Sequence, residues 1–218
     1  MTLKYEITDI QHPRNPKLFR IRALRDNPRV KVKVGYLGGY VQYEHNLSHE
    51  EDCWINGDAC VYGNVHVTGT ARISGHACVF GNARVFGNAR VFGNARVFGN
   101  AQVCNNARVY NNARIFGQAC VLGNVHVTDN ARVSGDSQVS GDVQVCNNAR
   151  VSGNAWILGN IILNENMEIT GGGVIKSLDQ IYYVDGVTAY FDVNKKLVVN
   201  GFTPGIEHHE TLARLKLL

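Results

Sequence analysis

Proline and charged residues are both scarce in this chain of 218 residues. Only 4 prolines occur, none of them between Pro28 and Pro204, and charged residues make up 18% of the sequence. Hydrophobic residues reach 44%, a balance that excludes an intrinsically disordered chain. No apolar run approaches the roughly 20 residues that a transmembrane helix needs. We therefore expect a folded, soluble protein that does not associate with a membrane.

A secretory signal is also missing from the start of the chain. Residues 1–10 mix Lys4, Glu6 and Asp9 with apolar residues, so they lack the continuous apolar core of a signal peptide. This favours residence in the cytoplasm, where the six cysteines would stay reduced.

The net charge of +4 is unevenly distributed. Residues 1–33 carry nine Lys or Arg against three acids, and residues 34–52 carry four acids with no Lys or Arg. Residues 53–172 carry eight Arg against six acids. This patchwork is compatible with nucleic-acid binding but does not require it.

A repeat with a period of six residues dominates the middle of the chain. From Gly81 the sequence reads GNARVFGNARVFGNARVFGNA, and looser copies extend in both directions. Ile, Val or Leu occupies every sixth position from Ile55 to Ile169, twenty positions without one slip. A small or aliphatic residue, usually Ala, stands two positions before each of them.

This period is typical of short strands rather than of a helix. At about 100° per residue, a helix cannot keep a six-residue repeat on one face. In a strand, Ala and Val of Ala-Arg-Val-Phe point to one side, whereas Arg and Phe point to the other. Gly-Asn then supplies the left-handed conformation of a tight turn. Three such strands would close a triangular coil of 18 residues with Val stacked on Val inside.

This pattern resembles the hexapeptide-repeat left-handed parallel β-helix over residues 53–172. We therefore predict an all-β solenoid of about 6.5 coils, roughly 30 Å tall at about 4.8 Å per rung. The left hand is what the resemblance implies, since the periodicity alone does not define it.

The open ends of such a solenoid need caps, because naked strand edges pair with other chains. We predict a β-rich N-terminal cap over residues 1–52 and a C-terminal β-meander with a short helix over residues 173–218. Asp179, Asp185 and Phe191 occupy small inward positions of the continued register, so we expect the solenoid to end near residues 171–173. The terminal helix is predicted to begin at Thr203 or Pro204.

The cap sequence extends the resemblance to nearly the whole chain. Residues 19–24, 38–41, 46–48 and 53–55 look like the N-terminal module of a group of phage, prophage and bacterial hexapeptide proteins. The resemblance implies a phage or prophage origin and a location in the cytoplasm of the bacterial host. It carries no assigned reaction.

Acyl transfer is the alternative function, because most characterised hexapeptide β-helices are acyltransferases with a histidine base between subunits. His66 and His126 share the context GNVHVT but lie ten hexapeptides apart, so they point from different faces of one subunit. No loop interrupts the coils to frame a cleft. An acyltransferase would therefore use His66 or His126 at a trimer interface.

No catalytic residue, metal site or cofactor is predicted with this pattern. The adjacent His208 and His209 would diverge on a helix, and no closely spaced histidine pair occurs within the coils. The cysteines pair by register, Cys60 with Cys78 and Cys104 with Cys120, but no CxxC motif accompanies them. We interpret these cysteines as small outward residues.

Outward columns of aromatic and arginine side chains follow from the 18-residue coil. The residues predicted to form a binding or oligomerisation ladder are Tyr62, Phe80, Phe98 and Phe116 beside Arg96, Arg114, Arg132 and Arg150 on one face, and Phe92 and Tyr110 beside Arg90 and Arg108 on a second. The third face carries Phe86 beside Arg84.

Four stacked aromatics in water would form an exposed apolar patch, which soluble monomers usually avoid. Self-association would cover the patch, and a homotrimer is favoured. Arg beside Phe or Tyr also suits a host protein, a nucleotide or a nucleic acid. The sequence therefore favours a non-catalytic binding scaffold that sequesters a host target, such as a defence protein or a nucleotide signal.

Overall fold

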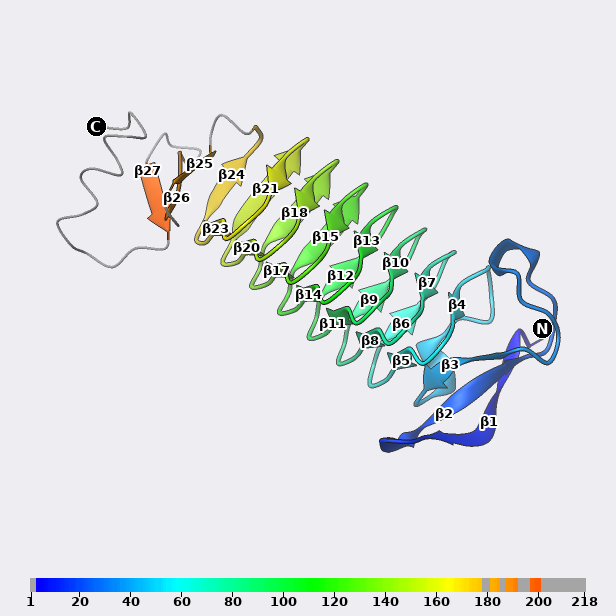
Figure 1. Cartoon of the computed structure of the whole chain (residues 1–218). Helices are drawn as coiled ribbons and strands as arrows, with labels where there is room; N and C mark the ends of the chain where they lie inside the picture. Colours follow the sequence, from blue (N-terminus) through cyan, green and yellow to red (C-terminus); the bar gives the residue numbers. More distant parts are fainter. Residues whose placement is uncertain (1–2, 178–180, 185–186, 192–196, 201–218) are drawn as a thin grey trace.

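The computed structural model describes residues 3–177, 181–184, 187–191 and 197–200. These residues form an all-β parallel solenoid with a hairpin at its N-terminal end (Figure 1). Among them, no helix has the length and apolar character needed to cross a membrane.

Three parallel ladders make the walls of the solenoid, and we name them faces I, II and III. Face I is the parallel part of a ten-stranded sheet: β3 (Leu37–Val41), β5 (Cys60–Val61), β8 (Cys78–Val79), β11 (Arg96–Val97), β14 (Arg114–Ile115), β17 (Arg132–Val133), β20 (Arg150–Val151) and β23 (Glu168–Ile169). Face II has seven strands: β4 (Trp54–Ile55), β7 (Arg72–Ile73), β10 (Arg90–Val91), β13 (Arg108–Val109), β16 (His126–Val127), β19 (Gln144–Val145) and β22 (Ile162–Leu163). Face III also has seven: β6 (His66–Val67), β9 (Arg84–Val85), β12 (Gln102–Val103), β15 (Cys120–Gly123), β18 (Gln138–Gly141), β21 (Ala155–Gly159) and β24 (Gly173–Ile175).

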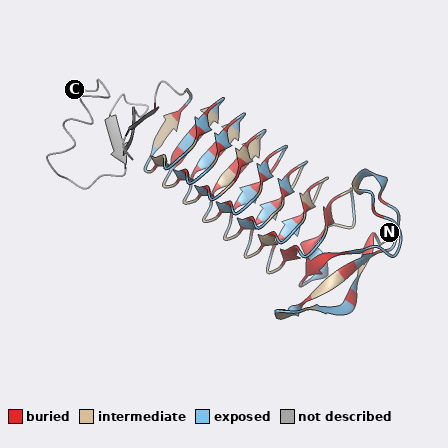
Figure 2. Cartoon of the chain, viewed as in Figure 1, coloured by how far each residue is buried: buried red, intermediate tan, exposed pale blue. Residues whose placement is uncertain are grey.

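The register confirms the coil of 18 residues, since Val91 pairs with Ile73 on one side and with Val109 on the other. All twenty aliphatic residues of the repeat have an exposed fraction of 0%. The residue two positions earlier is also inward, for example Ala95 and Ala113. Figure 2 shows the resulting alternation of buried and exposed residues along the coils. Each fully buried Val or Ile contributes roughly 1.5–3 kcal/mol through the hydrophobic effect.

The corners follow the predicted turn chemistry. Gly99 has a φ of 72° and Asn111 a φ of 58°, both in the left-handed region. The following Asn side chains point outward and stack into amide ladders, as in the hydrogen bond from Asn82 Nδ2 to Asn100 Oδ1 at 3.0 Å. Glycine or asparagine therefore occupies most of the turning positions, because both tolerate this conformation.

The solenoid has about eight turns rather than the predicted 6.5, because the cap itself supplies a first coil. Val41 pairs with Val61 and Leu47 with Val67, each twenty residues apart instead of eighteen, so the six-residue register does not reveal this coil. Both side chains are buried in the core. At the other end, parallel pairing continues to Ile175, just beyond the predicted end at residues 171–173.

A hairpin covers the first edge of face I. Strands β1 (Tyr5–His12) and β2 (Asn15–Ala23) pair antiparallel, and β2 pairs antiparallel with β3. Two short 3-10 helices, η1 (Pro28–Val30) and η2 (Glu44–Asn46), lie in the connections. Lys4 is buried here, and its Nζ donates to the Cys53 carbonyl oxygen at 2.9 Å.

At the C-terminal end, three strands pair antiparallel in succession: β25 (Ile181–Val184), β26 (Val187–Phe191) and β27 (Leu197–Asn200). They form the predicted meander (Figure 1). The helix predicted from Thr203 or Pro204 lies outside the described residues.

Candidate binding surfaces

The aromatic column on face I is a continuous stack of rings. The register places Tyr62, Phe80, Phe98 and Phe116 on successive rungs, where their ring centroids lie 5.1, 4.9 and 5.1 Å apart. The rings are nearly parallel, with interplanar angles of 3°, 1° and 3°. The column therefore belongs to the wall of the solenoid and is as rigid as the ladder beneath it.

The rings of this column are less exposed than expected from the sequence. All four residues are only partly exposed, because each ring covers the faces of its neighbours. The most exposed large apolar side chain in the described part of the chain is Val34, at 64%, which belongs to the N-terminal cap. What face I presents to a partner is a row of ring edges.

Arginines run beside the rings on face I. Arg96, Arg114, Arg132 and Arg150 occupy one column and are exposed. The ion pairs found among the described residues include none of these four side chains. Face I therefore offers guanidinium groups that are free to bind an anion.

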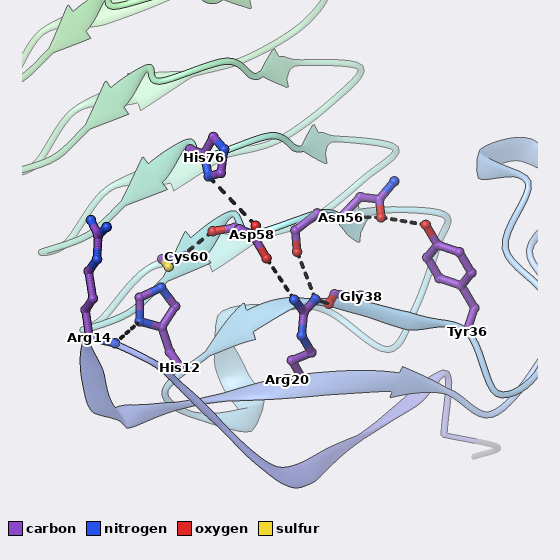
Figure 3. Close-up of polar contacts among 10 residues, drawn as sticks. His12, Arg14, Arg20, Tyr36, Gly38, Asn56, Asp58, Cys60 and His76 are labelled. Carbon is purple, nitrogen blue, oxygen red and sulfur yellow. Dashed lines mark hydrogen bonds and ion pairs between the residues drawn. The ribbon is translucent and has the colours of Figure 1, made fainter.

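Arg20 in the cap shows what a structural arginine looks like in this protein. Its Nη1 donates to the carbonyl oxygens of Gly38 at 2.8 Å and Gly57 at 3.1 Å, and its Nη2 pairs with Asp58 Oδ1 at 2.8 Å (Figure 3). The guanidinium also lies 4.4 Å from the centre of the Tyr40 ring. These contacts attach the hairpin to the first coils and leave Arg20 little capacity for a ligand.

Face II carries a second set of columns. Arg90 and Arg108 lie on adjacent rungs, and Phe92 stacks on Tyr110 with centroids 4.9 Å apart. The His126 ring then approaches the Tyr110 ring edge-on at 6.2 Å. Burial lowers the pKa of His126, and the nearby charge of Arg108 lowers it further, which favours the neutral ring.

The two candidate histidine bases lie on different faces, as predicted. His66 belongs to β6 on face III and His126 to β16 on face II. His66 has a neighbour that the sequence did not indicate, since the ring of His45 lies 5.4 Å from it. The sequence indicated only that the cap must end beside the first coil. Because the cap pairs with that coil at a spacing of twenty residues instead of eighteen, the repeat does not predict that His45 meets His66.

His45 and His66 line a hollow of about 560 Å³ at the edge of the cap, together with Glu44, Ser48 and His49. His49 is already engaged, because its Nδ1 accepts from the Lys4 backbone N–H and its Nε2 donates to Glu44 Oε1 at 3.0 Å. Within the described ranges, no three His, Cys, Asp or Glu side chains are grouped as metal ligands.

The cysteines are paired by register but less exposed than expected. Cys60 and Cys104 are buried, whereas Cys78 and Cys120 are partly exposed. The neighbouring Cys60 thiol lowers the pKa of Cys78 to about 7, with a smaller contribution from the charge of Arg96. The proximity of Cys78 raises the pKa of Cys60 in turn, and burial raises it further. The same arrangement lowers the pKa of Cys120 to about 7.

The fold and its columns define the class of this protein, a β-solenoid repeat scaffold. The sequence comparison agrees, since a family model described as YdcK beta solenoid repeat matches residues 83–99, 89–105, 101–117 and 143–159. The first two matches cover the most regular copies of the repeat. No curated protein matches the chain.

Proposed function

We propose that this chain is a non-catalytic binding scaffold that self-associates through face I and uses its arginine columns to hold an anionic target. The observation that carries the proposal is the stack from Tyr62 to Phe116 running beside arginines that have no ion-pair partner among the described residues. Aromatic and arginine side chains are the residue types that dominate binding energy at interfaces.

The repetition of the coils supports a scaffold rather than a catalytic centre. Adjacent rungs of face I present the same pair of side chains, Arg96 with Phe98 and Arg114 with Phe116. A catalytic centre needs a few different groups converging on one point, whereas a repeated pair suits an extended partner. Three identical chains packed through face I would cover the ring edges, and we propose a trimer.

The resemblance of the cap to phage and prophage proteins bears on the target. It supports a phage-encoded protein in the cytoplasm of a bacterial host, where an acidic defence protein or a nucleotide signal would be sequestered by binding alone. Sequestration requires many copies of a protein with a rigid binding surface, but no catalytic turnover.

Replacing the rings tests self-association. We expect Phe80→Ser, Phe98→Ser and Phe116→Ser together to reduce the solution mass, measured by light scattering, from that of an oligomer to that of one chain. Far-ultraviolet circular dichroism should show that the β-structure is retained. The matched control removes three rings from the other faces, by Phe86→Ser, Phe92→Ser and Tyr110→Ser, and should keep the oligomer. A wild-type protein with the mass of one chain, or an oligomer that survives the first triple substitution, would overturn this part of the proposal.

Acyl transfer is a second candidate, favoured by the hollow that brings His45 and His66 together. His66 Nδ1 lies 3.1 Å from the Asn64 carbonyl oxygen, which leaves Nε2 as the nitrogen that could act as a base. Acetyl transfer from acetyl-coenzyme A that is abolished by His66→Ala with His126→Ala would establish the enzyme. Absent transfer in the wild-type protein would eliminate the activity, and transfer unchanged in the variant would eliminate both histidines as the base.

A further inference from the structure

A polar groove of about 410 Å³ runs along the corner between faces III and II. One wall is a column of arginines, Arg72, Arg90 and Arg108, joined by Arg29 from the cap. The other wall is the corner column of Asn88, Asn106 and Asn124.

The register builds the arginine wall. Arg90 pairs with Arg72 and with Arg108 on neighbouring strands, which spaces the three side chains at about 4.8 Å per rung. The cap adds the fourth arginine, because Arg72 Nη2 donates to the Arg29 carbonyl oxygen at 2.6 Å and holds η1 against the first coils. The cap thereby closes one end of the groove.

The opposite wall consists of hydrogen-bond donors. Asn88 Nδ2 donates to Asn106 Oδ1 at 3.1 Å, and Asn106 Nδ2 donates to Asn124 Oδ1 at 3.0 Å. Each of these amides uses one N–H in the ladder and has a second N–H to offer. Both walls therefore contain N–H donors beyond those used along the asparagine column.

The positive charge of the groove is only partly compensated. No carboxylate is among the residues that line it, but two carboxylates contact lining residues: Asp52 Oδ2 lies 3.6 Å from Arg29 Nη1, and Asp142 Oδ1 accepts from Asn124 Nδ2 at 2.7 Å. Burial lowers the pKa of Arg72, and repulsion from Arg90 and Arg29 lowers it further. Assembling these like charges costs free energy, which a bound polyanion would recover.

We propose that this groove binds a ligand with several successive phosphate groups, either a nucleotide with a phosphate chain or a single-stranded nucleic acid. The inference rests on the proposed function only in treating the chain as a binding scaffold, and it uses a different surface from face I. A protein interface would need a central apolar or aromatic anchor, and the groove lining contains none. A phosphate chain needs only a row of charged and neutral N–H donors, which both walls supply.

The test measures binding of two probes, inorganic triphosphate by calorimetry and a fluorescent single-stranded oligonucleotide of mixed sequence by anisotropy. We expect Arg90→Gln with Arg108→Gln to weaken binding at least tenfold. For the oligonucleotide, the magnitude of the slope of log affinity against log salt should fall by about 1.4, about 0.7 for each phosphate contact removed from a single strand. Binding of both triphosphate and the oligonucleotide would show that a chain of phosphates is sufficient for recognition. Binding of the oligonucleotide alone would identify the ligand as a nucleic acid.

The matched control is Arg14→Gln with Lys17→Gln, which removes the same charge from the N-terminal hairpin, away from both the groove and the arginine columns, and should change affinity less than threefold. An equal loss in both double variants would show non-specific charge attraction and overturn the site. Absence of binding by both probes, or tighter binding of poly-glutamate, would overturn it too. Each measurement is repeated in the face I triple-serine variant. If that variant still binds the probes after its mass has fallen to that of one chain, binding in the groove does not depend on self-association. The two proposals can then be refuted independently.

Discussion

The stack of rings on face I makes a quantitative prediction about stability. Phe98 lies between Phe80 and Phe116, with centroid distances of 4.9 and 5.1 Å, whereas Phe116 has a ring neighbour on one side only. A stacked aromatic pair contributes about 0.5–1.5 kcal/mol beyond its burial. Phe98→Ser should therefore lose about 1–3 kcal/mol of stacking, and Phe116→Ser about half of that.

A double-mutant cycle separates stacking from the loss of buried area. Phe98→Ser and Phe116→Ser remove their shared contact once, so the double variant should be less destabilised than the sum by about 0.5–1.5 kcal/mol. The free energy of unfolding of each protein is measured by urea denaturation with circular dichroism, at equal concentration. An unchanged slope of the unfolding free energy against urea concentration would show that the variants expose the same amount of surface when they unfold.

The control cycle pairs Phe98→Ser with Phe92→Ser. Phe92 stacks on Tyr110 on face II, so the two substitutions share no ring contact and should add to within about 0.3–0.5 kcal/mol. If the Phe98 and Phe116 cycle shows no more coupling than this control, the column does not stabilise the coils, and its rings are held in register by the backbone alone.

Two further predictions concern the corners and the cysteines. Gly99→Ala should destabilise the protein by about 1–2 kcal/mol or more, because its φ is 72° and a Cβ would lie 2.9 Å from the Gly117 carbonyl oxygen. Gly172→Ala, where a Cβ would meet nothing within 4 Å, should change stability by less than about 0.5 kcal/mol in the same unfolding assay, and equal effects would contradict the steric argument. Because the pKa of Cys78 is lowered to about 7, its alkylation by iodoacetamide should rise with pH through about 7, followed by mass spectrometry of the peptide that contains it. Cys60→Ala removes the neighbouring thiol and should move that midpoint upward; an unmoved midpoint would assign the shift to another cause.

The coils and their surface columns could be predicted from the sequence because the relevant neighbours recur at a constant separation. Val91 must lie over Ile73 and under Val109 once three six-residue strands close a turn. The same rule puts Phe98 under Phe116. Parallel strands in register convert sequence distance directly into position, which is rarely true of folds with varied loops.

The first coil escaped prediction because the cap breaks that constant separation. Val41 and Leu47 join the core at a spacing of twenty residues, although the six-residue pattern begins only at Ile55. The exposure of the rings was also misjudged. Burial depends on how closely neighbouring rings stack, and at about 5 Å each one covers much of the next.

By itself, the sequence determined the parallel solenoid, its inward aliphatic columns and the order of side chains along each outward column, because a strict period leaves only one way to bury the repeated residues. Only the tertiary structure decided where the cap meets these columns. It placed Arg29 beside Arg72 and His45 beside His66, residues separated by 43 and 21 positions with no common period. Such contacts depend on how an irregular segment packs against a regular one, and local patterns do not encode that packing.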